Sequence, residues 1–128
     1  MSNKGRLIVV SGPTAAGKST LWKQLVTYPS VDFSVSATTR DMREGEADGV
    51  DYHFISKPEF ESKIAAGEFL EYAKVHRNYY GTLRSNVEQS IAKGRDIVLE
   101  VDVQGAAQLA DCGFPVISIF VLPPSRDV

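Results

Sequence analysis

The sequence predicts an α/β fold in which a parallel β-sheet has helices on both faces and carries a small inserted lobe of mixed strands and helices. Apolar runs of strand length alternate with stretches of helical periodicity, as they do in parallel sheets. A glycine-rich loop connects the first apolar run to the first helix. Between about residues 36 and 93 the elements become short, so we expect this segment to be the lobe. Residues 1–35 and 94–128, approximately, would then form the core of one domain.

Three strands and one helix are predicted before the middle of the chain. The apolar residues 7–10 indicate a buried strand, and the helical pattern of residues 19–26 follows it. Residues 33–39 have the composition of a short strand. The polar residues 41–51 contain two glycines that we expect to act as hinges, and residues 52–55 predict a further short strand.

A helix start signal opens the next part of the chain. Ser56 and Glu59 form a capping box around Pro58, which predicts a helix that ends at Gly67 and buries Phe60. The remaining predicted elements are an imperfectly alternating segment at 68–73, an amphipathic helix that carries Val87 and Ile91 and ends at Gly94, a buried strand at 97–102, a helix at 104–111 and a buried strand at 116–121.

Residues 12–19 match the pattern G-x-x-x-x-G-K-[ST], the phosphate-binding loop of P-loop NTPases. Because its glycines lack a Cβ, the backbone can turn successive N–H groups towards a phosphate. The helix N-terminus and Lys18 add positive charge, and the Ser19 hydroxyl can bind Mg²⁺. A chance glycine-rich turn is the alternative, which the strand before the loop and the helix after it disfavour. The predicted ATP-binding residues are Gly12, Pro13, Thr14, Ala15, Ala16, Gly17, Lys18, Ser19 and Thr20.

Two acidic and two basic side chains extend the predicted site. Glu100 and Asp102 are two residues apart on a predicted strand, so we expect both to leave one face near the edge where α/β sheets bind ligands. A solvated strand end is the alternative, but carboxylates in so apolar a run would be costly to bury without partners. Arg40 and Arg43 follow another strand and can bind a second phosphate group, although an exposed arginine pair is also ordinary solvated surface.

The composition limits the class of function. A chain of 128 residues with 43% hydrophobic residues can bury a core. Its formal net charge of −2 disfavours a nucleic-acid partner. The single Cys112 excludes an internal disulfide and a thiolate metal cage, which fits a reducing compartment. The sequence shows neither a signal peptide nor a membrane span, so we expect a cytoplasmic protein with no membrane partner, and we leave its oligomeric state open.

Further segments follow the loop in a specific order: residues 35–40, Arg43, residues 45–54, residues 78–82 and residues 99–105. Together with the loop they resemble guanylate kinases over nearly the whole chain. The Ser-x-Thr-Thr-Arg segment ending at Arg40 and the Gly-x-Asp-Tyr segment ending at Tyr52 are more specific than the loop, which many NTPases share. Within the loop, Thr14-Ala15-Ala16 replaces the family's usual Ser-Gly-Ala, and we expect no loss of phosphate chemistry.

The resemblance implies transfer of the γ-phosphoryl group of ATP to GMP, with Mg²⁺ as the metal and ATP and GMP as the partners. Lys18, Arg40 and Arg43 would be catalytic, and Ser19 and Glu100 would serve the metal. The GMP-binding residues would be Arg40, Arg43, Tyr52 and Tyr80 at the phosphate, and Ser36, Glu71, Thr82 and Asp102 around guanine. Carboxylates only accept hydrogen bonds, which suits the N1–H and amino donors of guanine and not the N1 acceptor of adenine. Structural roles are expected for Trp22, Tyr79, His53 and His76.

Two other functions stay open. A guanylate-kinase-like interaction module would bind without turnover, although the intact Lys18 and Ser19 disfavour it. A ribose bisphosphate kinase would share the framework, but Glu71 and Asp102 argue against it. Guanylate kinases begin an arginine-bearing lid at the point where this sequence ends, Val128. We therefore expect these 128 residues alone to bind GMP and to catalyse poorly.

Overall fold

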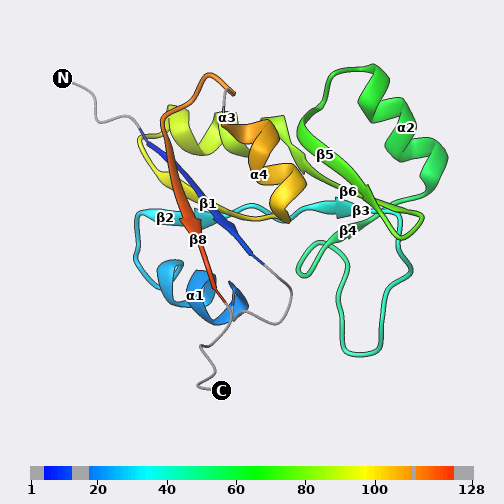
Figure 1. The fold of residues 1–128 in the computed structure, drawn as a ribbon, viewed down its shortest axis with the longest axis horizontal. Coiled ribbons are helices and arrows are strands. Elements are labelled where there is room, and N and C mark those ends of the chain that lie inside the picture. Colours follow the sequence, from blue (N-terminus) through cyan, green and yellow to red (C-terminus); the bar gives the residue numbers. More distant parts are fainter. Residues whose placement is uncertain (1–4, 13–17, 111, 123–128) are drawn as a thin grey trace.

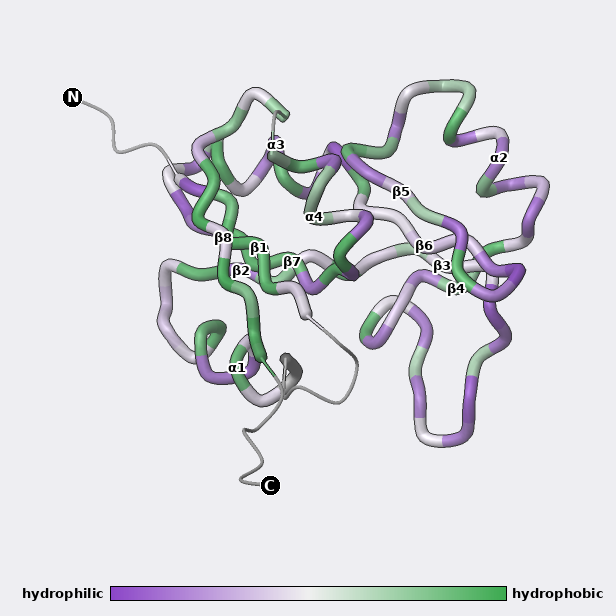
Figure 2. Tube along the Cα trace, viewed as in Figure 1, coloured by the Kyte–Doolittle hydropathy of each residue, from purple (hydrophilic) through white to green (hydrophobic). Residues whose placement is uncertain are grey.

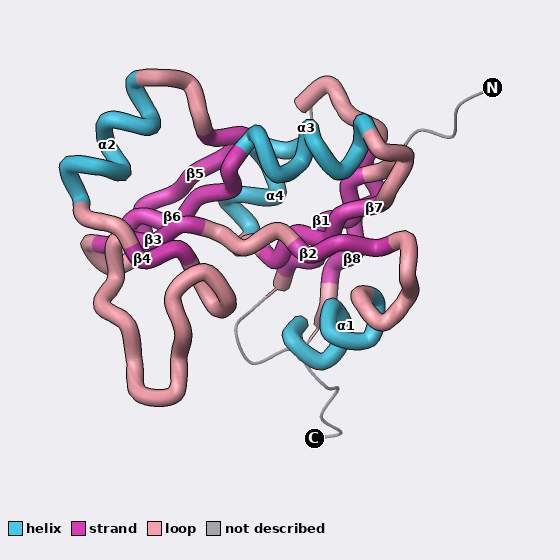
Figure 3. The backbone as a smooth tube through the Cα atoms, turned by 180° about the vertical axis from the view of Figure 1, so that it is seen from behind, coloured by secondary structure: helices cyan, strands magenta, loops and turns pink. Residues whose placement is uncertain are grey.

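Two four-stranded sheets lie side by side in the computed structural model, which describes residues 5–12, 18–110 and 112–122 (Figures 1 and 3). Of Lys18 and Ser19 only the backbone is described. Sheet A is parallel and has the strand order β2 (Val31–Phe33), β7 (Asp96–Glu100), β1 (Leu7–Ser11) and β8 (Val116–Phe120). Sheet B is mixed and has the order β4 (His53–Phe54), β3 (Ala37–Thr38), β6 (Asn78–Leu83) and β5 (Phe69–Val75). The helices are α1 (Lys18–Leu25), α2 (Lys57–Ala65), α3 (Arg84–Ala92) and α4 (Val103–Leu109).

Sheet A has a hydrophobic layer on each face. In Figure 2 much of β1 and β8 has the colour of hydrophobic residues. On one face Val9 and Leu99 pack with Val87 of α3 and Leu109 of α4. On the other face Val10 and its neighbours pack against α1. Full burial of one such side chain contributes about 1.5–3 kcal/mol. The predicted α/β fold with helices on both faces is therefore confirmed, and α3 packs on sheet A although we assigned it to the lobe.

Residues 116–121 were predicted to form a buried strand. The strand is present as β8, but the prediction that it is buried is wrong. Among the described residues β8 pairs with β1 alone and is an edge strand. The side chain of Ile117 is 37% exposed and that of Phe120 is 54% exposed. An apolar run does not distinguish a central strand, which has neighbours on both sides, from an edge strand.

The single strand predicted over residues 33–39 is also wrong, because the structure divides this segment between the two sheets. Phe33 pairs with Val98 in sheet A, whereas Thr38 pairs with Tyr80 in sheet B. The residues between them carry the chain from one sheet to the other, and the N–H of Ser34 still donates to the Val98 carbonyl (3.0 Å). This crossing places the start of β3 next to the carboxyl edge of sheet A.

The β5–β6 hairpin is the main element that the sequence analysis did not predict as a unit. Val75 pairs with Asn78, so His76 and Arg77 form a two-residue turn, with φ angles of 51° and 76°. Such turns require positive φ at both positions and favour Asn-Gly. Non-glycine residues cost roughly 1–2 kcal/mol each in this region, and the pair His-Arg carries no turn signal. Although no sequence signal marks its turn, the hairpin places Glu71 and Thr82 opposite each other.

The predicted start of α2 is confirmed. Ser56 is the N-cap, and its Oγ accepts from the Glu59 backbone N–H (3.2 Å). Phe60 is fully buried, with its ring stacked on Phe69 (centroids 4.3 Å apart) and on Tyr79 (4.9 Å). The packing role predicted for Tyr79 agrees with this contact. These aromatic rings hold α2 against sheet B.

Candidate functional site

Arg40, Tyr52 and Tyr80 meet because β3 lies between β4 and β6. Arg40 follows β3, Tyr52 precedes β4, and Tyr80 lies in β6. The Arg40 guanidinium carbon lies 5.1 Å from the centroid of the Tyr52 ring and 5.6 Å from that of Phe54. The Tyr52 and Tyr80 rings meet edge to face, with centroids 5.9 Å apart. We call these three residues the arginine–tyrosine cluster. Three of the four residues predicted to bind the GMP phosphate are thus brought together.

Glu46 organises this cluster, and the sequence analysis gave it no role. Its carboxylate accepts from both terminal nitrogens of Arg40 (2.8 and 2.9 Å). Oε1 also accepts from the backbone N–H of Arg43 (2.8 Å), whose side chain is exposed. The hydrogen bonds from Arg40 and Arg43 lower the pKa of Glu46 to about 2. The same contacts raise the pKa of Arg40, so both groups stay charged throughout the physiological range.

A second group, which we call the carboxylate cluster, consists of Glu71, Thr82 and Asp102. Glu71 is paired with Thr82 across β5 and β6, and its side chain is only 5% exposed. Burial raises the pKa of Glu71 to about 7; Thr82 opposes the shift through its hydroxyl and N–H, and the charge of Asp102 adds to it. Thr82 Oγ1 is itself buried beside this carboxyl, but it does not reach hydrogen-bond geometry with Glu71 or with any other described residue. A buried carboxyl and an unpartnered hydroxyl suit a ligand that offers hydrogen-bond donors.

Gly105 allows Asp102 and Glu71 to approach each other. Asp102 is the N-cap of α4, and its Oδ1 accepts from the Gly105 N–H (2.8 Å). A Cβ at Gly105 would collide with Oε1 of Glu71. The N-terminus of α4, which carries Asp102, can therefore pack close to Glu71 of β5. The sequence analysis did not predict this role for Gly105, because the requirement comes from β5, which is distant in the chain.

The structure separates the two acids that were expected to leave one strand face together. β7 ends at Glu100, so Asp102 belongs to the start of α4 and not to the strand. Oε1 of Glu100 instead accepts from the indole N–H of Trp22 (2.5 Å). Burial raises the pKa of the Tyr52 phenol, and the charge of Glu100 adds to this shift. The prediction of simple packing for Trp22 missed the hydrogen bond.

The phosphate loop lies mostly outside the described residues, which exclude 13–17 and the side chains of Lys18 and Ser19. Gly12 is described, with φ 141°, and a Cβ there would collide with the Val121 carbonyl of the neighbouring strand segment. Thr20 is exposed on α1. The register pairs Val10 with Glu100, so the acid lies beside the start of the loop. The phosphate-binding roles stay predictions.

Ser36 lies in the segment between the two sheets. Its side chain is half-buried, and its carbonyl accepts from the backbone N–H of His53 (2.8 Å). No hydrogen bond of its hydroxyl to another described residue is present, so its predicted contact with guanine stays a prediction.

Comparisons with known proteins bear on this arrangement. The family model described as guanylate kinase matches residues 4–128. The chain belongs to the guanylate kinase family. It is 53% identical to the guanylate kinase of Clostridium tetani over 97% of its own length, and 52% identical to that of Neisseria meningitidis over 98%. The crystal structure of the Anaplasma phagocytophilum guanylate kinase superposes with a TM-score of 0.84 at 37% identity, over 98% of this chain and 63% of that one.

The chain spans about 60% of the length of the curated guanylate kinases that it matches, 60% for the C. tetani enzyme and 62% for the N. meningitidis enzyme. Family membership thus covers the whole described fold, including both groups of candidate site residues. Among residues 5–12, 18–110 and 112–122, no helix has the length and apolar character needed to cross a membrane.

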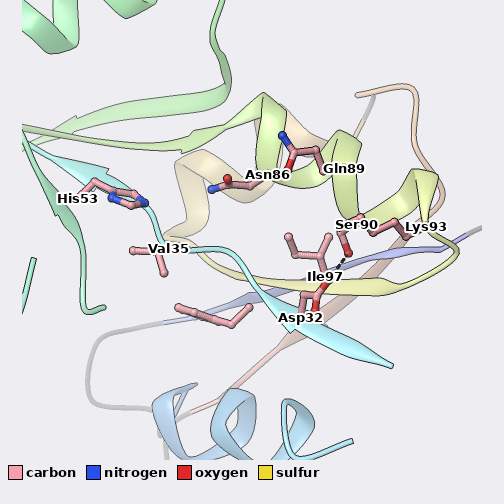
Figure 4. A pocket seen from close by; sticks show the side chains of 9 residues that line it. Asp32, Val35, His53, Asn86, Gln89, Ser90, Lys93 and Ile97 are labelled. Atoms are coloured by element: carbon pink, nitrogen blue, oxygen red, sulfur yellow. Dashed lines mark hydrogen bonds between the residues drawn. The ribbon is translucent and has the colours of Figure 1, made fainter. Parts of the chain in front are cut away.

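A cavity of about 300 Å³ lies elsewhere, along the outer edge of β2 and under α3 (Figure 4). Asp32 in its wall accepts from the Ser90 hydroxyl (2.9 Å) and forms an ion pair with Arg95 (2.8 Å), which lowers the pKa of Asp32. None of the predicted site residues lines this cavity. The lining residues are Asp32, Phe33, Val35, His53, Asn86, Gln89, Ser90, Lys93 and Ile97. The candidate site residues therefore lie in the two residue groups and not at this cavity.

Proposed function

We propose that this chain carries the GMP site and the phosphate loop of an enzyme that transfers the γ-phosphoryl group of ATP to GMP, giving ADP and GDP. The observation that carries the proposal is Glu71, a buried carboxyl that is paired with Thr82 across β5 and β6 and is influenced by the charge of Asp102. Such a carboxyl is costly to bury unless a ligand supplies donors. Guanine supplies two, at N1 and at its amino group.

The carboxylate cluster of Glu71, Thr82 and Asp102 would select guanine over adenine. Glu71 and Asp102 accept hydrogen bonds when ionised, whereas adenine would place the N1 lone pair against a carboxylate. Sites built around such bonds can reject an analogue that lacks the donor by about 10⁴–10⁵. Because the pKa of Glu71 is about 7, the carboxyl is partly protonated at neutral pH in the absence of ligand. The N1–H and amino donors of bound guanine would favour its ionised form.

The arginine–tyrosine cluster would bind the GMP phosphate. Glu46 accepts hydrogen bonds from both terminal nitrogens of Arg40, so the planar guanidinium is oriented before the ligand arrives. The phenols of Tyr52 and Tyr80 would add donors, and the exposed Arg43 would add a second charge. We propose that these cations offset the repulsion between donor and acceptor phosphates, which is a principal barrier to phosphoryl transfer.

The phosphate loop would bind ATP, with Lys18 following the transferred group. Ser19 and Glu100 offer the hard oxygen ligands that Mg²⁺ prefers, and Glu100 retains Oε2 free of hydrogen bonds to other described residues. When bound, the metal would neutralise phosphate charge. No covalent intermediate is needed, because GMP is itself the acceptor, and the protein's work is alignment and exclusion of water. We place the reaction in the cytoplasm, where Cys112 would stay reduced.

The test measures ADP formation by the chain with GMP, AMP or a ribose phosphate as acceptor, alongside calorimetric binding of each. The full-length C. tetani relative is the positive control. We expect GMP to bind and to be the preferred acceptor by at least about 10³-fold. Because the 128 residues alone are expected to catalyse poorly, ADP formation is also measured for a chain extended beyond Val128 by the corresponding segment of the C. tetani relative. Binding of GMP with no ADP formed by the extended chain would favour the interaction module, and preference for the ribose phosphate would favour the ribose bisphosphate kinase.

A further inference from the structure

Trp22 contacts the last residues of two strands, β2 and β7, at the carboxyl edge of sheet A. It lies in the second turn of α1, the helix that follows the phosphate loop. Its ring stacks on Phe33 of β2, with centroids 3.9 Å apart and planes at 16°, and Lys23 Nζ lies 5.8 Å from the ring centroid. Its indole N–H donates to Glu100 at the end of β7. The ring orientation is therefore fixed by packing, and that orientation aims the N–H at a carboxylate.

The position of Glu100 gives this hydrogen bond a consequence beyond packing. Glu100 is in register with Val10, two residues before Gly12 of the loop, and its charge also reaches Tyr52 in sheet B. The carboxylate thus lies at the end of β7, beside the strand that leads into the phosphate loop. A half-buried anion with several conformations open to it would be a poor partner for a hydrated metal. One oxygen tied to an indole N–H removes that freedom, because hydrogen bonds to ionised acceptors are short and strong.

We propose that Trp22 is a positioning residue, whose indole N–H holds one oxygen of Glu100 so that the other faces the water shell of magnesium-bound ATP. The inference rests on the proposed function for its ligand, but the Trp22–Glu100 contact is independent of it. Since the chain contains a single tryptophan, the same residue reports on the state of Glu100 without an added label.

The test compares Trp22→Phe, which keeps a ring against Phe33 and removes only the donor, with Phe33→Leu, which loosens the stack and keeps the donor. Binding of ATP is measured by calorimetry with Mg²⁺ and with chelator. Partners of metal ligands typically change metal affinity by 10–100-fold. We expect Trp22→Phe to weaken magnesium-dependent binding about tenfold, with no change in chelator, and Phe33→Leu to change both equally and by less than about threefold.

The Glu100→Ala background separates positioning from a structural role. If Trp22 acts through Glu100, Trp22→Phe costs nothing further there. An equal tenfold loss in both backgrounds, or no loss when Glu100 alone is replaced, would overturn the proposal. The folded fraction is checked by thermal unfolding for every variant.

A readout without nucleotide tests the contact itself. In an amide correlation spectrum the indole N–H gives one signal, and a carboxylate acceptor moves it downfield. We expect this signal to shift upfield in Glu100→Ala and to stay close to its original position in Glu100→Gln, which keeps an acceptor oxygen. An unmoved signal in Glu100→Ala would refute the inference. A chain that binds no ATP would instead contradict the proposed function, and the indole signal would still decide whether Trp22 holds Glu100.

Discussion

The central strands of sheet A bury aliphatic side chains on both faces, whereas sheet B buries polar groups together with its aromatic rings. In sheet A most buried side chains of the central strands β1 and β7 are aliphatic, such as those of Val9 and Leu99. In sheet B they include Thr38, Glu71 and Thr82. Hydrophobic burial tolerates small displacements because it has no direction, but a buried carboxyl depends on its specific neighbours. We therefore expect sheet A to contribute most of the stability, and the proposed function assigns recognition to sheet B, at a cost to stability.

The largest expected effect tests the first half of this comparison. Leu99→Ala leaves a cavity between β7 and the helices, and should lower the free energy of unfolding by about 2–5 kcal/mol. The matched control is Ile117→Ala on the exposed face of β8, with an expected cost below about 1 kcal/mol. Denaturant unfolding measures both. The preference of the folded protein for GMP over AMP should be unchanged, and a change in it would show that the two sheets are not separable in this way.

The second prediction concerns recognition. Glu71→Gln keeps the shape of the side chain but turns one acceptor into a donor, which would face a guanine donor. The affinity for GMP should fall about 100-fold, from the loss of hydrogen bonds to a charged group. Stability at pH 7 should change by less than about 1 kcal/mol, because Glu71 is already partly neutral there. Calorimetric titration with GMP and thermal unfolding measure the two quantities. Unchanged GMP affinity would remove Glu71 from the guanine site.

The third prediction tests the contact between α4 and β5. In Gly105→Ala the new methyl group would collide with Oε1 of Glu71 and lie 3.1 Å from Cβ of Val101. Glu71 must move, so we expect GMP to bind about tenfold more weakly, with a stability loss of about 1–3 kcal/mol. Ala107→Gly in the same helix is the control. It should cost at most about 1 kcal/mol of stability and leave GMP affinity unaltered.

The same contrast explains how far the sequence could predict the structure. The positions of β1, β7 and β8 in sheet A, the cap at Ser56 and the glycine after α3 follow from local patterns, and the structure agrees with them. The sequence also named the acids and cations of the candidate site, through the resemblance. It missed Glu46, Gly105 and the Trp22 hydrogen bond, because each acts through a partner that the fold brings together.

The boundaries failed where local preference was weak. The two strands β2 and β3 are short, and only their pairing with different sheets shows that they are separate. The turn at His76 and Arg77 violates the residue preferences of its type, so no sequence signal marks it. The domain limits near residues 36 and 93, and the roles of the phosphate-loop side chains, stay predictions.

The smallest expected effect is a dependence of stability on pH that comes from sheet B alone. The pKa of Glu71 is about 7 in the folded protein, against 4.5 for an unperturbed side chain. Between these values the folded state holds a proton that the unfolded state has released. The stabilising contribution of the protonated carboxyl is therefore full below pH 4.5 and is lost as the pH rises through 7.

Between pH 6 and pH 8 the free energy of unfolding should consequently fall by about 1 kcal/mol. Glu71→Gln should remove this fall, since the amide does not titrate. Leu99→Ala should show the same fall, starting from a lower free energy of unfolding. Urea unfolding at the two pH values measures all three proteins. The opposite carboxylate, Glu46, has its pKa lowered to about 2 and stays ionised across this range, so it adds no slope. An equal fall in Glu71→Gln would show that another group titrates in this range. It would contradict the proposal that ionisation of the buried Glu71 lowers the stability of the folded protein.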